Sequence, residues 1–216
     1  IETAVYAINP NNGHILAVVG GTNYQESTFN RAVDARRQSG STIKPFLYYA
    51  ALENGFTPST TFTSEKTTFS FSGGKTYTPK NYNDKYANGP ISLAAAISYS
   101  DNIYAVKTHM FLGEDVLVKT ANRLGISNSL PEIPSLPLGT SEIGIIDMAS
   151  AYSVFANSGY KTTPHLITKI EDITGNILYE FQETPELVLN PSLTYILNEL
   201  LTTTYDSTFI DYNYPT

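Results

Sequence analysis

Residues 3–8 alternate in the manner of a β-strand, and an apolar, strand-like run follows them after a turn. Residues 3–8 read TAVYAI, residues 9–13 read NPNNG, and residues 14–21 read HILAVVGG. A period of two is typical of a β-strand, and a cluster of Asn, Pro and Gly is typical of a turn. The pattern therefore predicts a β-hairpin over residues 3–19.

The next apolar pattern has the period of a helix. It follows a polar, irregular stretch that ends at Gly40, and its apolar residues recur at intervals of three and four until Gly55. Such intervals place the apolar residues on one face of a helix, and glycine commonly follows a helix end. We predict a helix over residues 41–54, with its apolar face in the core and with Ser41 and Lys44 on the opposite side.

Further helical patterns and hairpin patterns share the rest of the chain. They do not alternate regularly, which favours an α+β fold with antiparallel pairing of strands. The predicted helices are 92–98, 103–112, 114–124, 146–157 and 191–203, and residues 167–181 (ITKIEDITGNILYEF) predict a hairpin that turns at Thr174 and Gly175.

Composition narrows the class of protein. The 216 residues are 41% hydrophobic and 15% charged, which is ordinary for a globular chain that buries a core. A net charge of -7 with 13 Lys and Arg argues against a nucleic-acid partner. The absence of cysteine excludes disulfides and thiol catalysis, but it suits a reducing cytosol and an extracytoplasmic protein equally well.

The three histidines give no sign of a metal site. His14, His109 and His165 lie in separate predicted elements, and no two of them have the spacing of metal ligands. The sequence therefore predicts neither a metal nor a cofactor. It also has no apolar run of the length of a transmembrane helix.

The stretch SGSTIKPF at residues 39–46 places Ser41 and Lys44 one helical turn apart. A serine hydroxyl is a poor nucleophile unless a base takes its proton, and lysine serves as that base when burial or nearby positive charge lowers its pKa. A helix N-terminus disfavours a protonated lysine and stabilises an oxyanion near the Ser41 amide. These residue types suit an acylation site. The alternative is that Ser41 caps the helix and Lys44 is solvated.

A second polar cluster, Ser100-Asp101-Asn102, stands between two predicted helices. A second hydroxyl can relay a proton between the lysine and a leaving amine, and an amide side chain can hold both the lysine and a substrate carbonyl. The pairing of S-x-x-K with S-D-N is a signature of penicillin-binding proteins and class A β-lactamases. Taken alone, the cluster is better explained as a helix cap.

Three longer blocks extend the two motifs. Residues 4–21, 29–55 and 138–167 resemble, in this order, the transpeptidase domain of class A penicillin-binding proteins, which are bifunctional peptidoglycan synthases of bacteria. FNRA leading into ARRQSGSTIKPF is the most specific part of the resemblance. The resemblance implies a single α+β domain over residues 1–216, with the fold shared by penicillin-binding proteins and serine β-lactamases and with helices flanking an antiparallel sheet.

The resemblance also implies a function. A penicillin-binding protein of this class is held at the extracytoplasmic face of the bacterial membrane and cross-links peptidoglycan stem peptides that end in D-Ala-D-Ala. By position, Ser41 matches the nucleophile, Lys44 the general base, Ser100 the proton relay, and Asn102 the amide that orients lysine and substrate. Penicillins would acylate the same serine and block it.

One motif of the family is not found where it is expected. The Lys-Thr-Gly strand would follow the helix at 191–203, whereas the nearest string, GGKTY at 73–77, precedes Ser100 and has Tyr77 in place of glycine. We therefore predict a hairpin turn at 73–77. We also expect the membrane anchor and the glycosyltransferase domain to lie outside these residues, and the third motif to lie further along the same chain or on another chain.

Other functions remain open at this point. A serine β-lactamase or a D,D-carboxypeptidase would use water as the acceptor, and Glu142 is the candidate for the deacylating base that a β-lactamase needs. A turn or cap role explains Glu142 more simply. A β-lactam sensor or scaffolding module that keeps the fold without turnover is the alternative that is not an enzyme.

Overall fold

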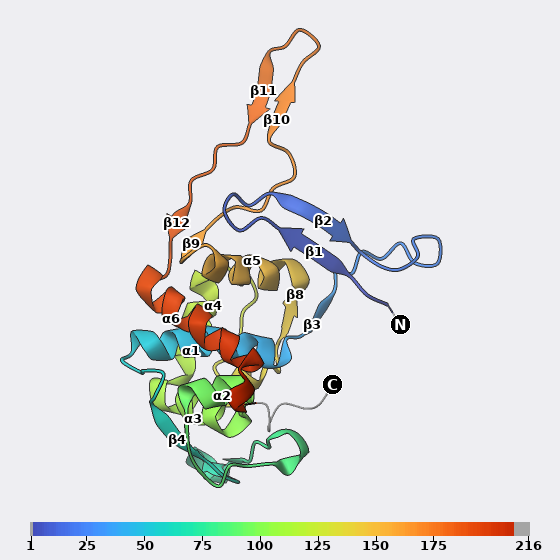
Figure 1. Ribbon diagram of the computed structural model, residues 1–216. Coiled ribbons are helices and arrows are strands. Elements are labelled where there is room, and N and C mark those ends of the chain that lie inside the picture. Colours follow the sequence, from blue (N-terminus) through green and yellow to red (C-terminus); the bar gives the residue numbers. More distant parts are fainter. Residues whose placement is uncertain (1, 210–216) are drawn as a thin grey trace. The chain divides into compact units, whose positions relative to one another are not determined.

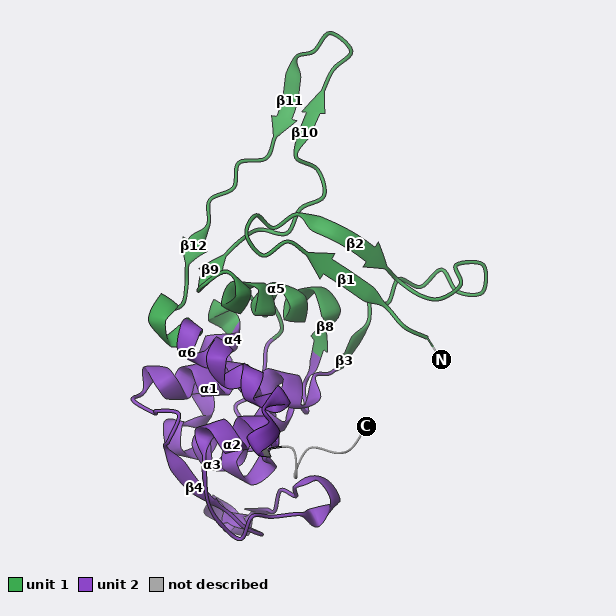
Figure 2. Ribbon diagram, in the orientation of Figure 1, with its two compact units in different colours: residues 1–37, 122–128, 143–194 green, residues 38–121, 129–142, 195–216 purple. Residues whose placement is uncertain are grey.

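The computed structural model describes residues 2–209 (Figure 1). The chain forms two compact units, each assembled from separate stretches of sequence (Figure 2). The first unit comprises residues 1–37, 122–128 and 143–194, and the second comprises residues 38–121, 129–142 and 195–216.

The predicted N-terminal hairpin is confirmed in the first unit. Strand β1 (Val5–Ile8) pairs antiparallel with β2 (Ile15–Val19). The turn between them needs Gly13, whose φ is +73° and whose amide donates to the carbonyl of Asn9 at 2.9 Å. A Cβ at this glycine would stand 2.2 Å from the carbonyl oxygen of Thr163, so no other residue fits without moving the backbone.

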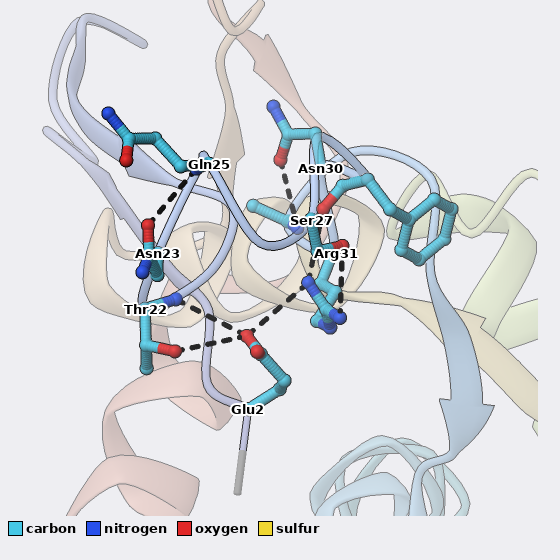
Figure 3. Close-up of polar contacts among 9 residues, drawn as sticks. Glu2, Thr22, Asn23, Gln25, Ser27, Asn30 and Arg31 are labelled. Atoms are coloured by element: carbon cyan, nitrogen blue, oxygen red, sulfur yellow. Dashed lines mark hydrogen bonds and ion pairs between the residues drawn. The ribbon is translucent and has the colours of Figure 1, made fainter.

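The loop after β2 is tied back to the start of the chain (Figure 3). Glu2 accepts hydrogen bonds from the amide and the hydroxyl of Thr22, each at 3.3 Å, and pairs with Arg31 at 3.4 Å. The Arg31 amide donates to the carbonyl of Gly20 at 2.9 Å, where a Cβ would lie 2.5 Å from the side-chain oxygen of Asn30. The FNRA block thus packs directly on the Gly-Gly end of the hairpin.

The second predicted hairpin is confirmed in the same unit. Strands β10 (Lys169–Glu171) and β11 (Ile177–Glu180) pair antiparallel. The Asp172 carboxylate organises the turn, because it accepts from the amides of Thr174 and Asn176 at 2.8 and 2.9 Å. The remaining elements whose residues all lie in this unit are α5 (Ile145–Ala156) and the antiparallel pair of β9 (Tyr160–Lys161) and β12 (Glu186–Leu187).

The second unit combines helices with short strand pairs. Its buried core takes apolar side chains from each of its main helices, so a polar group placed among them is far from water. Its helices are α1 (Lys44–Glu53), α2 (Leu93–Ser98) and α3 (Asn102–Leu112), and its antiparallel pairs are β4 (Thr61–Ser64) with β7 (Gly89–Ser92) and β5 (Phe69–Ser70) with β6 (Thr76–Tyr77). Core residues without exposed surface include Ile43, Phe46, Leu47, Tyr49, Leu93, Ile103 and Leu117.

Four elements contain residues of both units. They are α4 (Glu114–Arg123), α6 (Pro191–Thr202), β3 (Arg36–Gln38) and β8 (Glu142–Gly144).

All five helices predicted after residue 90 are present, with ends within two residues of the prediction. The α+β class is confirmed, and the strands of the described residues pair as two-stranded sheets.

The helix predicted over residues 41–54 differs in two ways. The α-helix begins at Lys44 rather than at Ser41, and every residue from Lys44 to Leu52 is buried. The prediction of a helix with one polar side was wrong, because Tyr48, Tyr49 and Leu52 fill positions opposite the apolar face and pack as core residues. Lys44 therefore lies in the interior, with 3% of its surface exposed.

The string GGKTY forms a hairpin turn, as predicted. Strands β5 and β6 flank a short 3-10 turn (Ser72–Gly74) in which Gly73 has a φ of +77°.

Within residues 2–209, no helix combines the length and the hydropathy that crossing a bilayer requires.

Candidate active site

Ser41 lies in a single 3-10 turn, η1 (Gly40–Ile43), immediately before α1. Two glycines position this turn. The Gly40 amide donates to the carbonyl of Gly139 at 3.1 Å, and a Cβ on Gly139 would stand 2.0 Å from the Gly40 carbonyl oxygen. The two backbones approach closely because Gly139 has no side chain, whereas a Cβ on Gly40 would meet no atom within 4 Å.

The Ser41 side chain is exposed and caps neither η1 nor α1. The alternative that Ser41 is a helix cap is therefore excluded. In the part of the chain that the structure describes, the hydrogen bonds of the Lys44 amine go to other residues and not to the Ser41 hydroxyl. The nucleophile candidate is thus accessible, one helical turn from a buried amine.

Lys44 is held by the second motif. Its Nζ donates to the backbone carbonyl of Ser100 at 2.7 Å, to the Ser100 hydroxyl at 3.0 Å and to the side-chain oxygen of Asn102 at 2.7 Å. In the sequence, Ser100 and Asn102 lie 56 and 58 positions after Lys44, in a separate motif. The structure brings Lys44, Ser100 and Asn102 into direct contact, as predicted.

Burial lowers the pKa of Lys44 to about 7, and the nearby Asp101 carboxylate opposes this shift. Near neutral pH a substantial fraction of the amine is therefore unprotonated. An ammonium can donate to all three oxygens, whereas a neutral amine has two hydrogens and one lone pair. Of the three oxygens only the Ser100 hydroxyl can also donate, so it is the partner that can reverse its hydrogen bond when Lys44 loses a proton.

The Ser100-Asp101-Asn102 corner joins α2 to α3. Ser100 has a left-handed backbone with φ of +53°, and its amide donates to the carbonyl of Ile97 at 3.1 Å. Asp101 caps α3 by accepting from the Tyr104 amide at 2.7 Å. The cap interpretation is correct for Asp101, while its two neighbours Ser100 and Asn102 contact Lys44.

Sequence reasoning missed a further set of residues around this corner. The Asp101 carboxylate accepts from the Ser64 hydroxyl at 2.5 Å and from the Asn81 amide at 2.7 Å. The Asn102 side chain donates to the carbonyl of Lys80 at 2.7 Å. These partners come from β4 and from the loop after β6, where no periodic pattern or motif distinguishes them.

The other candidates of the sequence are not part of this cluster. Glu142 is an exposed residue at the start of β8 and is not among the three acceptors of Lys44. The rings of His14 and His165 contact each other edge to face at 4.7 Å. Across residues 2–209, no three side chains of His, Asp or Glu are grouped so that they could hold a metal ion.

The first unit contains a cavity of about 370 Å³ that none of the predicted site residues lines. It is formed by the end of β2 and the loop that follows. Its lining residues are Val18, Val19, Gly20, Gly21, Tyr24, Ser27, Thr28, Phe29 and Asn30.

An exposed serine one turn before a buried lysine, with a Ser-x-Asn corner on that lysine, defines the class of lysine-assisted serine acyl-transfer sites. Comparison with known proteins specifies the family. The family described as the penicillin-binding protein transpeptidase domain matches residues 3–207. The chain belongs to this family.

Individual relatives agree with this assignment. Penicillin-binding protein 2D of Bacillus subtilis is 46% identical over 207 residues, which are 95% of this chain and 30% of that protein. The crystal structure of penicillin-binding protein 1A from Haemophilus influenzae is 31% identical with a TM-score of 0.89 and covers 95% of this chain. That match takes up 35% of the other chain, so the sequence spans about a third of the length of these relatives.

A third comparison concerns a structure with a bound antibiotic. The PonA1 protein of Mycobacterium tuberculosis, in complex with penicillin V, is 25% identical to this chain with a TM-score of 0.77. The match covers 91% of this chain and 54% of that chain. The fold described above is therefore that of proteins that bind penicillins.

Proposed function

We propose that this chain provides the nucleophile and base of a serine D,D-transpeptidase that cross-links peptidoglycan stem peptides. The observation that carries the proposal is the buried Lys44 amine, whose pKa is lowered to about 7 while it is in contact with the Ser100 hydroxyl. An amine that served only as a structural cation would have to stay protonated, which requires a pKa far above 7. An amine that takes a proton from a serine works best with a pKa near the pH of the reaction.

In the acylation step, the Ser41 Oγ attacks the carbonyl carbon between the two D-alanines of a stem peptide. Lys44 takes the hydroxyl proton and gives a proton to the Ser100 oxygen, as the Ser100 hydroxyl passes its own proton to the nitrogen of the departing D-alanine. The C–N bond breaks as the ester to Ser41 forms, so one hydroxyl proton ends on the leaving amine. Asn102 holds the lysine through its side-chain oxygen at 2.7 Å.

In the second step, an amine of a neighbouring stem peptide attacks the ester carbonyl. Lys44 and Ser100 take a proton from the attacking amine and pass one to the Ser41 oxygen as the new amide bond forms and the ester C–O bond breaks, which restores the starting state. A penicillin would enter the first step in the same way. The opened β-lactam nitrogen stays attached to the acyl group, so it cannot leave and make room for the acceptor amine.

The relatives support the setting of this reaction. Their names place them among penicillin-binding proteins, and PonA1 has been captured with penicillin V. The proposed location is the extracytoplasmic face of a bacterial membrane, with the anchor outside these residues. No cofactor takes part in the proposed steps.

The test is intact-mass spectrometry of the protein as the cell makes it, after incubation with benzylpenicillin. We expect a mass increase of one penicillin that is lost in Ser41→Ala. The matched control is Ser39→Ala, because the Ser39 hydroxyl is buried without a hydrogen-bond partner in the described residues and lies two positions from Ser41. No adduct on the folded wild-type protein, or an adduct that persists in Ser41→Ala, would refute the assignment of the nucleophile.

A second measurement separates the transpeptidase from the alternatives. A stem-peptide analogue ending in D-Ala-D-Ala is supplied with and without an amine acceptor, and the products are separated by mass. Transfer to the amine supports the proposal, while release to water alone indicates a carboxypeptidase. Rapid hydrolysis of a chromogenic cephalosporin indicates a β-lactamase, and a lasting adduct without peptide turnover indicates a sensor.

A further inference from the structure

The loop at Lys80 and Asn81 contacts the catalytic corner from the outside. The Asn81 side-chain oxygen accepts from the amide of Asn102 at 2.7 Å and from that of Ile103 at 3.3 Å. Its side-chain nitrogen donates to the Asp101 carboxylate at 2.7 Å. One side chain therefore binds three consecutive residues at the start of α3, two of which belong to the Ser-Asp-Asn motif.

The same loop determines which way the Asn102 amide faces. The Lys80 carbonyl accepts from the Asn102 nitrogen at 2.7 Å, which leaves the Asn102 oxygen directed to the Lys44 amine at 2.7 Å. If the amide were rotated, its oxygen would face the Lys80 carbonyl and its nitrogen would face the lysine. The two oxygens could not hydrogen-bond, and the nitrogen could not accept from a protonated Lys44. The Lys80 carbonyl thus selects the orientation that Lys44 needs.

Strand β4, whose Ser64 contacts the same motif, is held to α3 by hydrogen bonds. Ser64, at the end of β4 and without exposed surface, donates to Asp101 at 2.5 Å. The strand is fixed to α3 at two other points, since Lys107 donates to the carbonyl of Thr63 and Tyr104 to that of Thr60, each at 2.8 Å. The corner is therefore held by a framework of hydrogen bonds and not by a single contact.

We propose that Asn81 is a positioning residue for the acyl-transfer site: it holds the start of α3 so that the Asn102 side-chain oxygen remains on the Lys44 amine. The inference rests on the proposed function for its effect on catalysis, but its geometric content is independent of that function. Asn81 does not touch the reacting atoms. It acts through Asn102, and an error of about 1 Å in the position of such a group can lower a rate by about a hundredfold.

The first measurement is a crystal structure of Asn81→Ala in the protein as the cell makes it. We expect the distance from the Asn102 oxygen to the Lys44 nitrogen to lengthen from 2.7 Å to beyond about 3.5 Å, the limit of a hydrogen bond. The matched control is Asn83→Gly, which removes the same amide group from the same loop while glycine keeps the φ of +55°. An unchanged distance in Asn81→Ala overturns the proposal.

The second measurement is the kinetics of acylation by a fluorescent penicillin. We expect the limiting rate constant of Asn81→Ala to fall at least about tenfold with little change in the half-saturating concentration, because the base is misplaced and the binding surface is not. Asn83→Gly should stay within about twofold of wild type. A purely structural role for Asn81 would lower the melting temperature and leave the limiting rate constant of the folded variant unchanged, which also overturns the proposal.

The two measurements distinguish a failure of this inference from a failure of the proposed function. If the wild-type protein is not acylated, the proposed function fails and the crystallographic distance still decides the role of Asn81. If Asn81→Ala does not fold, Asn81→Ser takes its place with the same expectations. Its hydroxyl is too short to bridge Asp101 and the Asn102 amide.

Discussion

The corner around Lys44 and the hairpin β10–β11 are built in opposite ways. The hairpin turn is organised by Asp172, whose partners Thr174 and Asn176 lie within four residues of it. The Lys44 amine instead takes all three of its acceptors from residues 56 and 58 positions away. Both strands of the hairpin are exposed along their length, whereas Lys44 is buried.

This difference shows where each region derives its order. The hairpin depends on a local turn, so it can open without disturbing distant residues. The corner depends on long-range contacts that exist only in the folded unit, so a change in one of them moves groups that carry the chemistry. Substitutions at the corner should therefore alter reactivity, and substitutions at the hairpin should alter only local order.

The largest expected effect is at Lys44. We expect Lys44→Met, which keeps much of the buried volume and removes the amine, to lower the rate constant of acylation by penicillin by about 10² to 10⁴-fold, the range for loss of a general base. Stopped-flow fluorescence with a reporter penicillin measures it. A rate within about threefold of wild type in folded protein would show that the amine is not the base.

The next effect is on the pH dependence of acylation. The pKa of Lys44 is about 7 and the unprotonated amine is the reactive form, so the rate constant should rise as pH increases through about 7 and level off above it. The Asp101 carboxylate raises this pKa, so Asp101→Asn should move the midpoint to lower pH. A profile that falls between pH 6 and 8, or a midpoint moved upward by Asp101→Asn, would contradict the assignment.

A smaller effect concerns the backbone of the corner. Ser100 has a φ of +53°, a conformation that costs a residue with a side chain on the order of 1 kcal/mol and costs glycine little. Ser100→Gly should therefore be about 1 kcal/mol more stable than Ser100→Ala in urea unfolding. Both variants lack the hydroxyl and should be slow in acylation. Equal stability of the two would show that the left-handed backbone is not strained.

The smallest effect is expected at the hairpin. Asp172→Ala removes the acceptor of the Thr174 and Asn176 amides and should raise amide hydrogen exchange in β10 and β11. The acylation rate constant should remain within about twofold of wild type. A slowed acylation would show that the hairpin is coupled to the site and would remove the contrast drawn above.

Much of the fold could be predicted because its signals are local. The period of two in TAVYAI and the turn NPNNG identified β1 and β2, and helical periods bounded by glycine, proline or polar residues identified α1 to α6. The burial of Lys44 could not be predicted in this way. A period shows which positions are apolar, but not whether the lysine and tyrosine on the other side of a helix will also be covered.

The site was predicted in part for a similar reason. Ser41, Lys44, Ser100 and Asn102 fall in two short motifs that carry their own spacing. Asn81 and Ser64 belong to no recognisable motif, because an asparagine in a loop and a serine at a strand end are common in any protein. Their role depends on a fold that brings them to the start of α3, which is a property of distant contacts.

Under the proposed function, the close approach of Gly40 and Gly139 has a consequence for resistance to antibiotics. Every missense change of a glycine codon adds at least a Cβ, and at Gly139 that atom would overlap the Gly40 carbonyl oxygen at 2.0 Å. Mutations that adapt the surroundings of Ser41 to a drug are therefore blocked at this position. Under drug selection, variation has to arise at positions where the backbone leaves room for a side chain.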